Sequence, residues 1–202
     1  SYPNRKRKGL NMNSAPHHVK REEIIDYQTY SEIREEIRDE IMKIKTSRRI
    51  HLGQYLTFLF ENHETIKYQI QEITRAERTV RESSIQEEIA VYNSLLGNKG
   101  QLGCALLIEI PEEKDRRPLL TAWLGLQEHF YLVLADGSRV YAEYDSSQVG
   151  EDRLSAVQYL TFSLDSPPVG LGCDFENLNE EIDLSKEQME ALAEDLSATQ
   201  VA

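Results

Sequence analysis

Cysteine is scarce in this chain of 202 residues. The two thiols, Cys104 and Cys173, exclude both a disulfide framework and a cysteine-rich metal site, and each is typical of a small buried apolar residue. Long apolar runs are also missing: the longest, such as ALLI and YLVLA, are far too short to span a bilayer. No secretory signal pattern is present, so we expect a cytoplasmic protein without membrane insertion.

Positive charge is in short supply. The chain has 23 lysines and arginines against 35 acidic residues, a net charge of −12, which argues against nucleic acid as a partner. The exception is the run RKRK at 5–8, inside a polar stretch without apolar periodicity. We expect residues 1–19 to be a disordered basic leader or extension, with a nucleic-acid arm as the less favoured alternative. Residues 20–202 then form a single domain.

The first half of that domain is predicted to be mainly helical, with strands over 48–62 and 102–110. Isoleucines recur at helical spacing over 33–44, with Ser31 as the expected N-cap. A strand broken at Gly53 is predicted over 48–62, because the segment alternates and is rich in β-branched and aromatic residues. Helices at about 64–80 and 85–96 follow, then a strand over 102–110 and a helical stretch interrupted at Pro118.

The second half reads mainly as strands. Two apolar runs flank Asp136-Gly137, a dipeptide typical of a hairpin turn, and another strand is predicted over 155–164. The acidic segment 165–202 ends in a helix whose Ser185 and Gln188 form a capping box, which favours packing on the domain over a solvated tail. The predicted class is α+β: an antiparallel sheet of about five strands packed against three or four helices.

Several stretches match a known family in order and spacing: RRIHLGQYLTFLFEN, YQIQEITRAERTV, IQEEIAVYNSLL, LIEI and SAVQYLTFSL. From about Lys20 to Leu164 the chain resembles a bacterial family catalogued as domain of unknown function 3501. Where that family has Asp-His-Pro, this chain has Asp174-Phe175-Glu176, so no role of that histidine is carried over. The resemblance implies a bacterial protein whose relatives are encoded near rubrerythrin-like and iron–sulfur oxidoreductase proteins.

Two glutamates occupy positions where an apolar residue is expected. On a helical wheel started at Ile66, Glu77 falls about 20° away, inside the apolar stripe. Glu88 falls between Tyr92 and Leu95 on the following helix. A buried carboxylate must be protonated, paired or bound to a ligand, because burying it alone costs several kcal/mol.

Three interpretations of these glutamates stay open. The favoured one is a buried glutamate–arginine network, since Arg48, Arg49, Arg78 and Arg81 are near in sequence. The second is a ligand pocket around Glu77, Glu88 and Arg49, with Glu61 and Glu72 as further oxygen donors. The third is a metal site, which the missing Glu-x-x-His spacing disfavours, so neither a metal nor a cofactor is expected.

The sequence contains no Gly-rich phosphate loop, Gly-x-Ser-x-Gly or Cys-x-x-Cys motif. We therefore expect a non-enzymatic accessory or interaction protein for an iron–sulfur or rubrerythrin-type redox system. The alternative is an enzyme, or a small-ligand or metal-binding protein, that uses a buried carboxylate–arginine pocket. Assembly into a homo-oligomer is left open.

Overall fold

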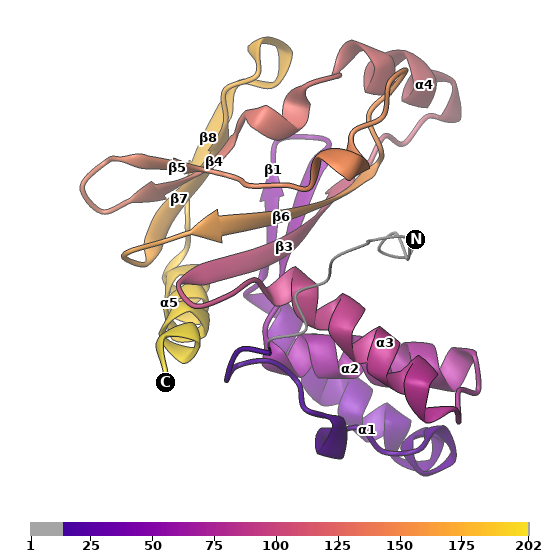
Figure 1. The fold of residues 1–202 in the computed structure, drawn as a ribbon. Helices are drawn as coiled ribbons and strands as arrows, with labels where there is room; N and C mark the ends of the chain where they lie inside the picture. Colours follow the sequence, from indigo (N-terminus) through magenta and orange to yellow (C-terminus); the bar gives the residue numbers. More distant parts are fainter. Residues whose placement is uncertain (1–13, 202) are drawn as a thin grey trace.

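Two four-stranded antiparallel sheets and five α-helices make up residues 14–201, the part of the chain that the computed structural model describes (Figure 1). The α+β class is confirmed, but there are eight strands in two sheets instead of about five in one. The difference has two sources. The region 48–62 forms a hairpin of two strands, and the acidic segment after residue 165 contributes two more.

The first sheet has the strand order β1-β2-β3-β6. Its strands are β1 (Arg49–Leu52), β2 (Leu56–Phe60), β3 (Gln101–Ile108) and β6 (Val157–Ser163). Gly53, with a positive φ of 63°, makes the turn between β1 and β2, where the sequence indicated a break. Phe58 pairs with Ile50 on one side and with Leu106 on the other, so all three point to the same buried face.

The second sheet has the order β5-β4-β7-β8. Its strands are β4 (Phe130–Leu134), β5 (Arg139–Tyr141), β7 (Pro168–Cys173) and β8 (Glu180–Asp183). The predicted hairpin turn at Asp136-Gly137 is confirmed, with Gly137 at φ 85°. The two sheets face each other over one core, in which the rings of Phe58 and Phe130 meet edge to face at 5.4 Å.

The sheets also meet along their edges. Glu143 forms an isolated antiparallel bridge with Thr161 of β6, directly after β5. On the opposite side, a side chain on Gly53 would collide with the carboxylate of Glu180, so β1 and β8 approach closely there. The strands therefore form a flattened, nearly closed barrel.

Helices lie at opposite ends of this barrel: α4 (Glu113–Ala122) at one end and α5 (Lys186–Gln200) at the other (Figure 1). The capping box of Ser185 and Gln188 at the start of α5 is confirmed. Leu192 and Leu196 of α5 are buried in the core. The acidic C-terminal segment thus packs on the domain.

A buried ion pair ties α5 to the start of β1. Arg48 donates from Nε and Nη2 to the two carboxylate oxygens of Asp195, at 2.7 and 2.8 Å, and both side chains are 8% exposed. Arg48 also donates to the carbonyl of Ile44 at the end of the first helix. The planar guanidinium therefore satisfies both oxygens of the carboxylate at once.

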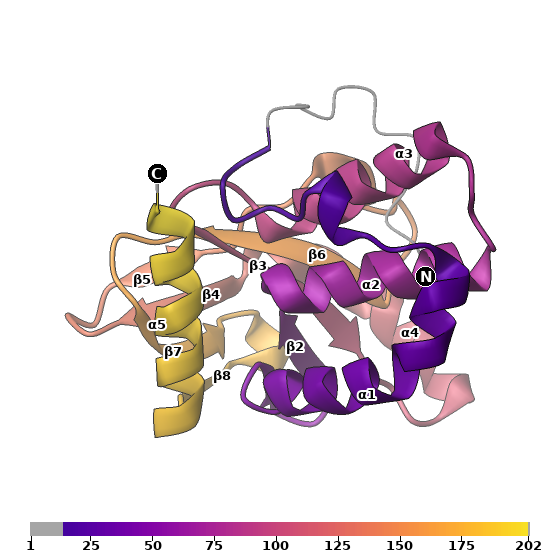
Figure 2. The same ribbon diagram turned by 90° about the horizontal axis from the view of Figure 1, so that it is seen from below.

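Three helices form a layer at one end of the first sheet (Figures 1 and 2): α1 (Tyr27–Thr46), α2 (His63–Ala76) and α3 (Glu82–Asn93). The N-cap of α1 is Asp26 and not the predicted Ser31, which lies inside the helix and donates to the carbonyl of Tyr27. The layer has its own apolar core, made of Val19, Ile24, Ile66, Ile70, Ile73, Ile85, Ile89, Tyr92 and Leu96.

The N-terminal strap, residues 14–25, crosses α3 and then α2 (Figure 2). His18 is 6% exposed and Val19 is 2% exposed, so the folded domain begins before Lys20. The remainder of the predicted leader, residues 1–13, lies outside the described residues. Within the described part of the chain, no helix is both long enough and apolar enough to span a membrane.

Candidate functional site

The structure places Glu77 outside α2, with its side chain exposed, so the predicted burial is wrong. The helix ends at Ala76 and Glu77 is its C-cap. Arg78 then takes a positive φ of 49°, and Thr79 donates its N–H to the carbonyl of Thr74. The chain leaves the helix at this turn, so the helical wheel does not apply to residue 77.

Arg49 is exposed on β1, whereas Arg48 beside it is buried. Glu88 is buried in α3, as predicted. Glu61, directly after β2, has one carboxylate oxygen that is buried without a hydrogen-bond partner among residues 14–201. The pKa of Glu61 is raised, because the effect of burial exceeds the opposite effect of a hydrogen bond with the Thr65 side chain.

The sequence predicted a carboxylate–arginine pair for Glu77 and Glu88. In the structure, Glu72 forms a pair of this kind. Arg34 of α1 donates to it from Nε and Nη2, at 2.9 and 2.8 Å, and the hydroxyls of Tyr30 and Tyr68 donate at 2.7 and 3.1 Å. The hydrogen bonds from Arg34, followed by those from the two tyrosines, lower the pKa of Glu72 to about 2. This ionised cluster joins α1 to α2.

The five predicted site residues come from five places in the fold: β1, the end of β2, α2, the turn after α2, and α3. Their role in ligand binding stays a prediction. Between residues 14 and 201, no three His, Cys, Asp or Glu side chains gather in a way that could hold a metal ion.

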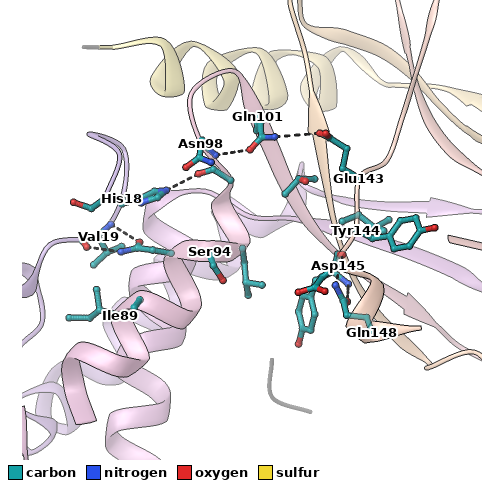
Figure 3. Close-up of a pocket in the computed structure, with 18 of the residues that line it drawn as sticks. His18, Val19, Ile89, Ser94, Asn98, Gln101, Glu143, Tyr144, Asp145 and Gln148 are labelled. Atoms are coloured by element: carbon teal, nitrogen blue, oxygen red, sulfur yellow. Dashed lines mark hydrogen bonds between the residues drawn. The ribbon is translucent and has the colours of Figure 1, made fainter. Parts of the chain in front are cut away.

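A cleft of about 540 Å³ opens between α3 and β6, and none of the five predicted residues lines it (Figure 3). One wall is helical and consists of the N-terminal strap, α3 and the turn that follows α3. The other wall belongs to the barrel and consists of β6 and the segment 143–148. The walls meet where residues 94–96 lie against β3, so closely that a side chain on Gly103 would overlap the carbonyl of Leu95.

Hydrogen bonds hold the helical wall in shape. The side-chain amide of Asn93 accepts from the N–H of Val19 at 2.8 Å and donates to its carbonyl at 3.0 Å. Gln71 of α2 pairs with both backbone groups of Ile25 in the same way, at 2.8 and 3.0 Å. Two side-chain amides thus attach the strap to the helices as a neighbouring strand would.

A side-chain amide also pairs with both backbone groups of one residue in the barrel wall. The amide of Gln148 accepts from the N–H of Tyr159 at 2.9 Å and donates to its carbonyl at 3.3 Å. Gln101 connects the two walls: its oxygen accepts from the N–H of Asn98, and its nitrogen donates toward the carboxylate of Glu143 (Figure 3). The cleft is therefore formed before any ligand binds.

Charges of opposite sign line the two walls. Lys20 and Arg21 stand on the helical wall, and Glu143 and Asp145 stand on the barrel wall. Arg21 is held by Glu82 through two hydrogen bonds of 2.8 and 2.9 Å, which fixes the position of its charge. Because Glu82 balances the charge of Arg21 within the chain, Lys20 is the other basic side chain on this wall.

A second polar cluster lies at the second sheet. His129, just before β4, directs Nδ1 to Asp174 at 2.6 Å. Tyr141 donates to the other oxygen of Asp174 at 2.5 Å, and Arg139 lies 3.7 Å away, stacked on the ring of Tyr131. The hydrogen bond from Tyr141 is the main cause that lowers the pKa of Asp174.

The fold and the cleft together define an α+β protein in which a three-helix layer and a flattened antiparallel barrel enclose a preformed polar cleft. The chain belongs to the family described as "Protein of unknown function (DUF3501)", whose family model matches residues 18–196. The resemblance noted in the sequence is thereby confirmed.

The chain is also similar to a solved structure, that of a novel protein of unknown function from Burkholderia pseudomallei K96243, with 27% identity and a TM-score of 0.81. The match covers 88% of this chain and 98% of the other. No curated protein matches the sequence.

Proposed function

We propose that this protein is a binding protein without a reaction of its own, and that the cleft between α3 and β6 takes a polar segment of a partner. The observation that carries the proposal is the way in which the side-chain amides of Asn93, Gln101 and Gln148 hold both walls in place. A site that is already ordered loses little conformational freedom on binding, which favours affinity.

The proposed ligand is a short peptide segment with charges of both signs. The volume of about 540 Å³ falls within the range of roughly 300–1,000 Å³ usual for ligand pockets. Lys20 would attract a carboxylate, while Glu143 and Asp145 would attract an ammonium or guanidinium group.

As the partner we propose an iron–sulfur oxidoreductase or a rubrerythrin-like protein. The support is the family resemblance, which implies that relatives are encoded beside such proteins. On this proposal the redox chemistry belongs to the partner. Both thiols of the present chain are buried, and burial raises the pKa of each.

The test uses two tryptophan variants of α3. Ala90 lines the cleft, so Ala90→Trp should fill it, whereas Glu87 is exposed on the same helix and does not line the cleft. Each purified variant is mixed in turn with a purified rubrerythrin-like protein and a purified iron–sulfur oxidoreductase from the same organism, and binding is measured by calorimetry. We expect Glu87→Trp to bind like the unmodified chain and Ala90→Trp to bind at least about tenfold more weakly, a loss of about 1.4 kcal/mol.

Equal binding by the two variants would show that the interface with the partner lies outside the cleft. Absence of binding to both kinds of redox protein would overturn the proposed partner. Titration of ¹⁵N-labelled protein with a panel of mixed-charge dipeptides then tests the cleft by itself. Shifts confined to the side-chain amide signals of Asn93, Gln101 and Gln148 are expected, and unchanged signals would refute peptide binding.

A further inference from the structure

We propose that His17 and His18 form a pH-sensitive latch on the carbonyl of Gly97. The latch holds the strap, and with it the helical wall of the cleft, at neutral pH and releases both on acidification. Only the effect on ligand binding rests on the proposed function, since the release of the strap is a property of the unliganded protein.

The partners of His18 determine its tautomer. The backbone N–H of Ala15 donates to Nδ1 at 3.1 Å, so Nδ1 must carry a lone pair. Nε2 lies 2.7 Å from the carbonyl of Gly97, which only accepts, so Nε2 must carry the hydrogen. A second proton on Nδ1 would face the N–H of Ala15 and break that contact. The latch is therefore made for a neutral imidazole.

His17 adds a second group with the same requirement. Its Nε2 donates to the same carbonyl of Gly97 at 3.2 Å, and the two imidazole rings are 4.6 Å apart. Its Nδ1 is buried without a hydrogen-bond partner among the described residues, so a proton there would be an unpaired buried charge. Burial lowers the pKa of both histidines, and the charge of His18 lowers that of His17 further.

The surroundings offer little compensation for a positive charge. On α2, His63 faces His17 and lowers its pKa, and its own partners are Glu23 at 2.9 Å and Glu64 at 2.8 Å. From α3 the strap meets the neutral amide of Asn93 and the carboxylate of Glu82, which is paired with Arg21. The turn after α3 carries Lys99, which is exposed. Within residues 14–201, the hydrogen bonds of the two latch imidazoles go to backbone groups and not to carboxylates.

The sign of the pH effect follows from these lowered pKa values. The latched state favours the neutral imidazoles, and the released state takes up protons at the ordinary histidine pKa of 6.5. The latch is therefore at full strength above pH 6.5 and weakens as pH falls below that value, by about tenfold per pH unit for each proton taken up.

Release would open the cleft because the strap is part of its wall. His18, Val19, Lys20 and Arg21 all line the cleft. Once the latch opens, the strap loses its hydrogen bonds to Gly97. It is then held by the clamps of Asn93 on Val19 and Gln71 on Ile25 and by the ion pair of Arg21 with Glu82. A partner bound in the cleft at neutral pH is therefore released on acidification.

Hydrogen-exchange mass spectrometry of the full-length chain tests the latch. Exchange of peptides covering 14–21 is compared at pH 7.5 and 5.0, corrected for the intrinsic pH dependence of exchange, with α5 as the internal reference. We expect the protection of 14–21 to fall at pH 5.0 while that of α5 is kept. In His18→Gln, an amide replaces the imidazole, keeps a donor for Gly97 and does not titrate, so the fall should be smaller. His17→Gln should likewise reduce the number of protons involved, and the double variant should remove the effect.

Unchanged protection of 14–21 in the unmodified chain at pH 5.0 would overturn the latch. An undiminished fall in the double variant would overturn it as well. No ligand is present in this experiment, so its result stands apart from that of the tryptophan variants. If the latch releases but partner binding is the same at both pH values, the effect of release on the cleft is refuted.

Discussion

Glu72→Gln tests whether the observed pair of Glu72 with Arg34, and not the pair that the sequence suggested for Glu77, stabilises the fold. In the folded protein four donors contact the carboxylate of Glu72: two nitrogens of Arg34, of which Nε is shared between both oxygens, and the hydroxyls of Tyr30 and Tyr68. The side chain of Glu72 is 21% exposed and that of Arg34 is 23% exposed, so water reaches the cluster only in part.

The magnitude follows from counting donors. A glutamine has one oxygen, which accepts from two of the four donors, so the other two donors lose their partner. An orphaned buried donor costs about 1–3 kcal/mol, and the partial exposure places each of these at the lower end. We therefore expect Glu72→Gln to lower the free energy of unfolding by roughly 2–3 kcal/mol at pH 7.

Urea denaturation monitored by circular dichroism measures this change, with Glu77→Gln as the matched control on the same segment. Because Glu77 is exposed, its substitution should cost less than about 1 kcal/mol. The folded pKa of Glu72, about 2, lies below its ordinary value of 4.5, so its contribution is complete above pH 4.5 and is lost between pH 4.5 and 2. The free energies of unfolding of the unmodified chain and of Glu72→Gln, plotted against pH, should therefore converge between pH 4.5 and 2. Equal destabilisation by the two substitutions, or a difference that does not change with pH, would refute the argument.

Three further outcomes follow from buried contacts. Asn93→Leu should lower the free energy of unfolding in urea by roughly 2–6 kcal/mol, because two buried backbone groups of Val19 lose their partner. Gly172→Ala places a methyl group 2.4 Å from the hydroxyl of Tyr131, and a thermal melt should show a loss of roughly 1–3 kcal/mol from overpacking. Cys104, whose pKa is raised by burial, should react with a chromogenic disulfide reagent only after denaturant is added.

Local signals in the sequence predicted local structure well. The turn at Asp136-Gly137 and the capping box of Ser185 and Gln188 are set by residues within four positions of one another, and both are confirmed. The end of α2 was missed because Arg78 is not a glycine, although it adopts the left-handed conformation in which glycine usually ends a helix. That single turn moved Glu77 from a predicted core position to the surface.

Long-range pairs are the part that the sequence did not reveal. Two carboxylate–arginine pairs are present, Glu72 with Arg34 and Asp195 with Arg48, in place of the predicted burial of Glu77. The latter pair is 147 residues apart in sequence. The cleft was missed for the same reason, since its walls come from segments far apart in sequence. The amides that shape it, such as Asn93, are ordinary polar residues until the backbone that they bind is known.

The pair of Arg48 with Asp195 also bears on how the protein is made. During synthesis Arg48 emerges long before Asp195, so any part of the first sheet that forms before residue 195 is made forms beside an arginine that still lacks its carboxylate. The apolar end of the barrel that Leu192 and Leu196 cover is open for the same interval. A chain that stops before α5 therefore exposes both an unneutralised charge and apolar surface, the features by which cellular quality control recognises unfinished protein. α5 thus supplies both the neutralising carboxylate and the apolar cover that the preceding strands lack.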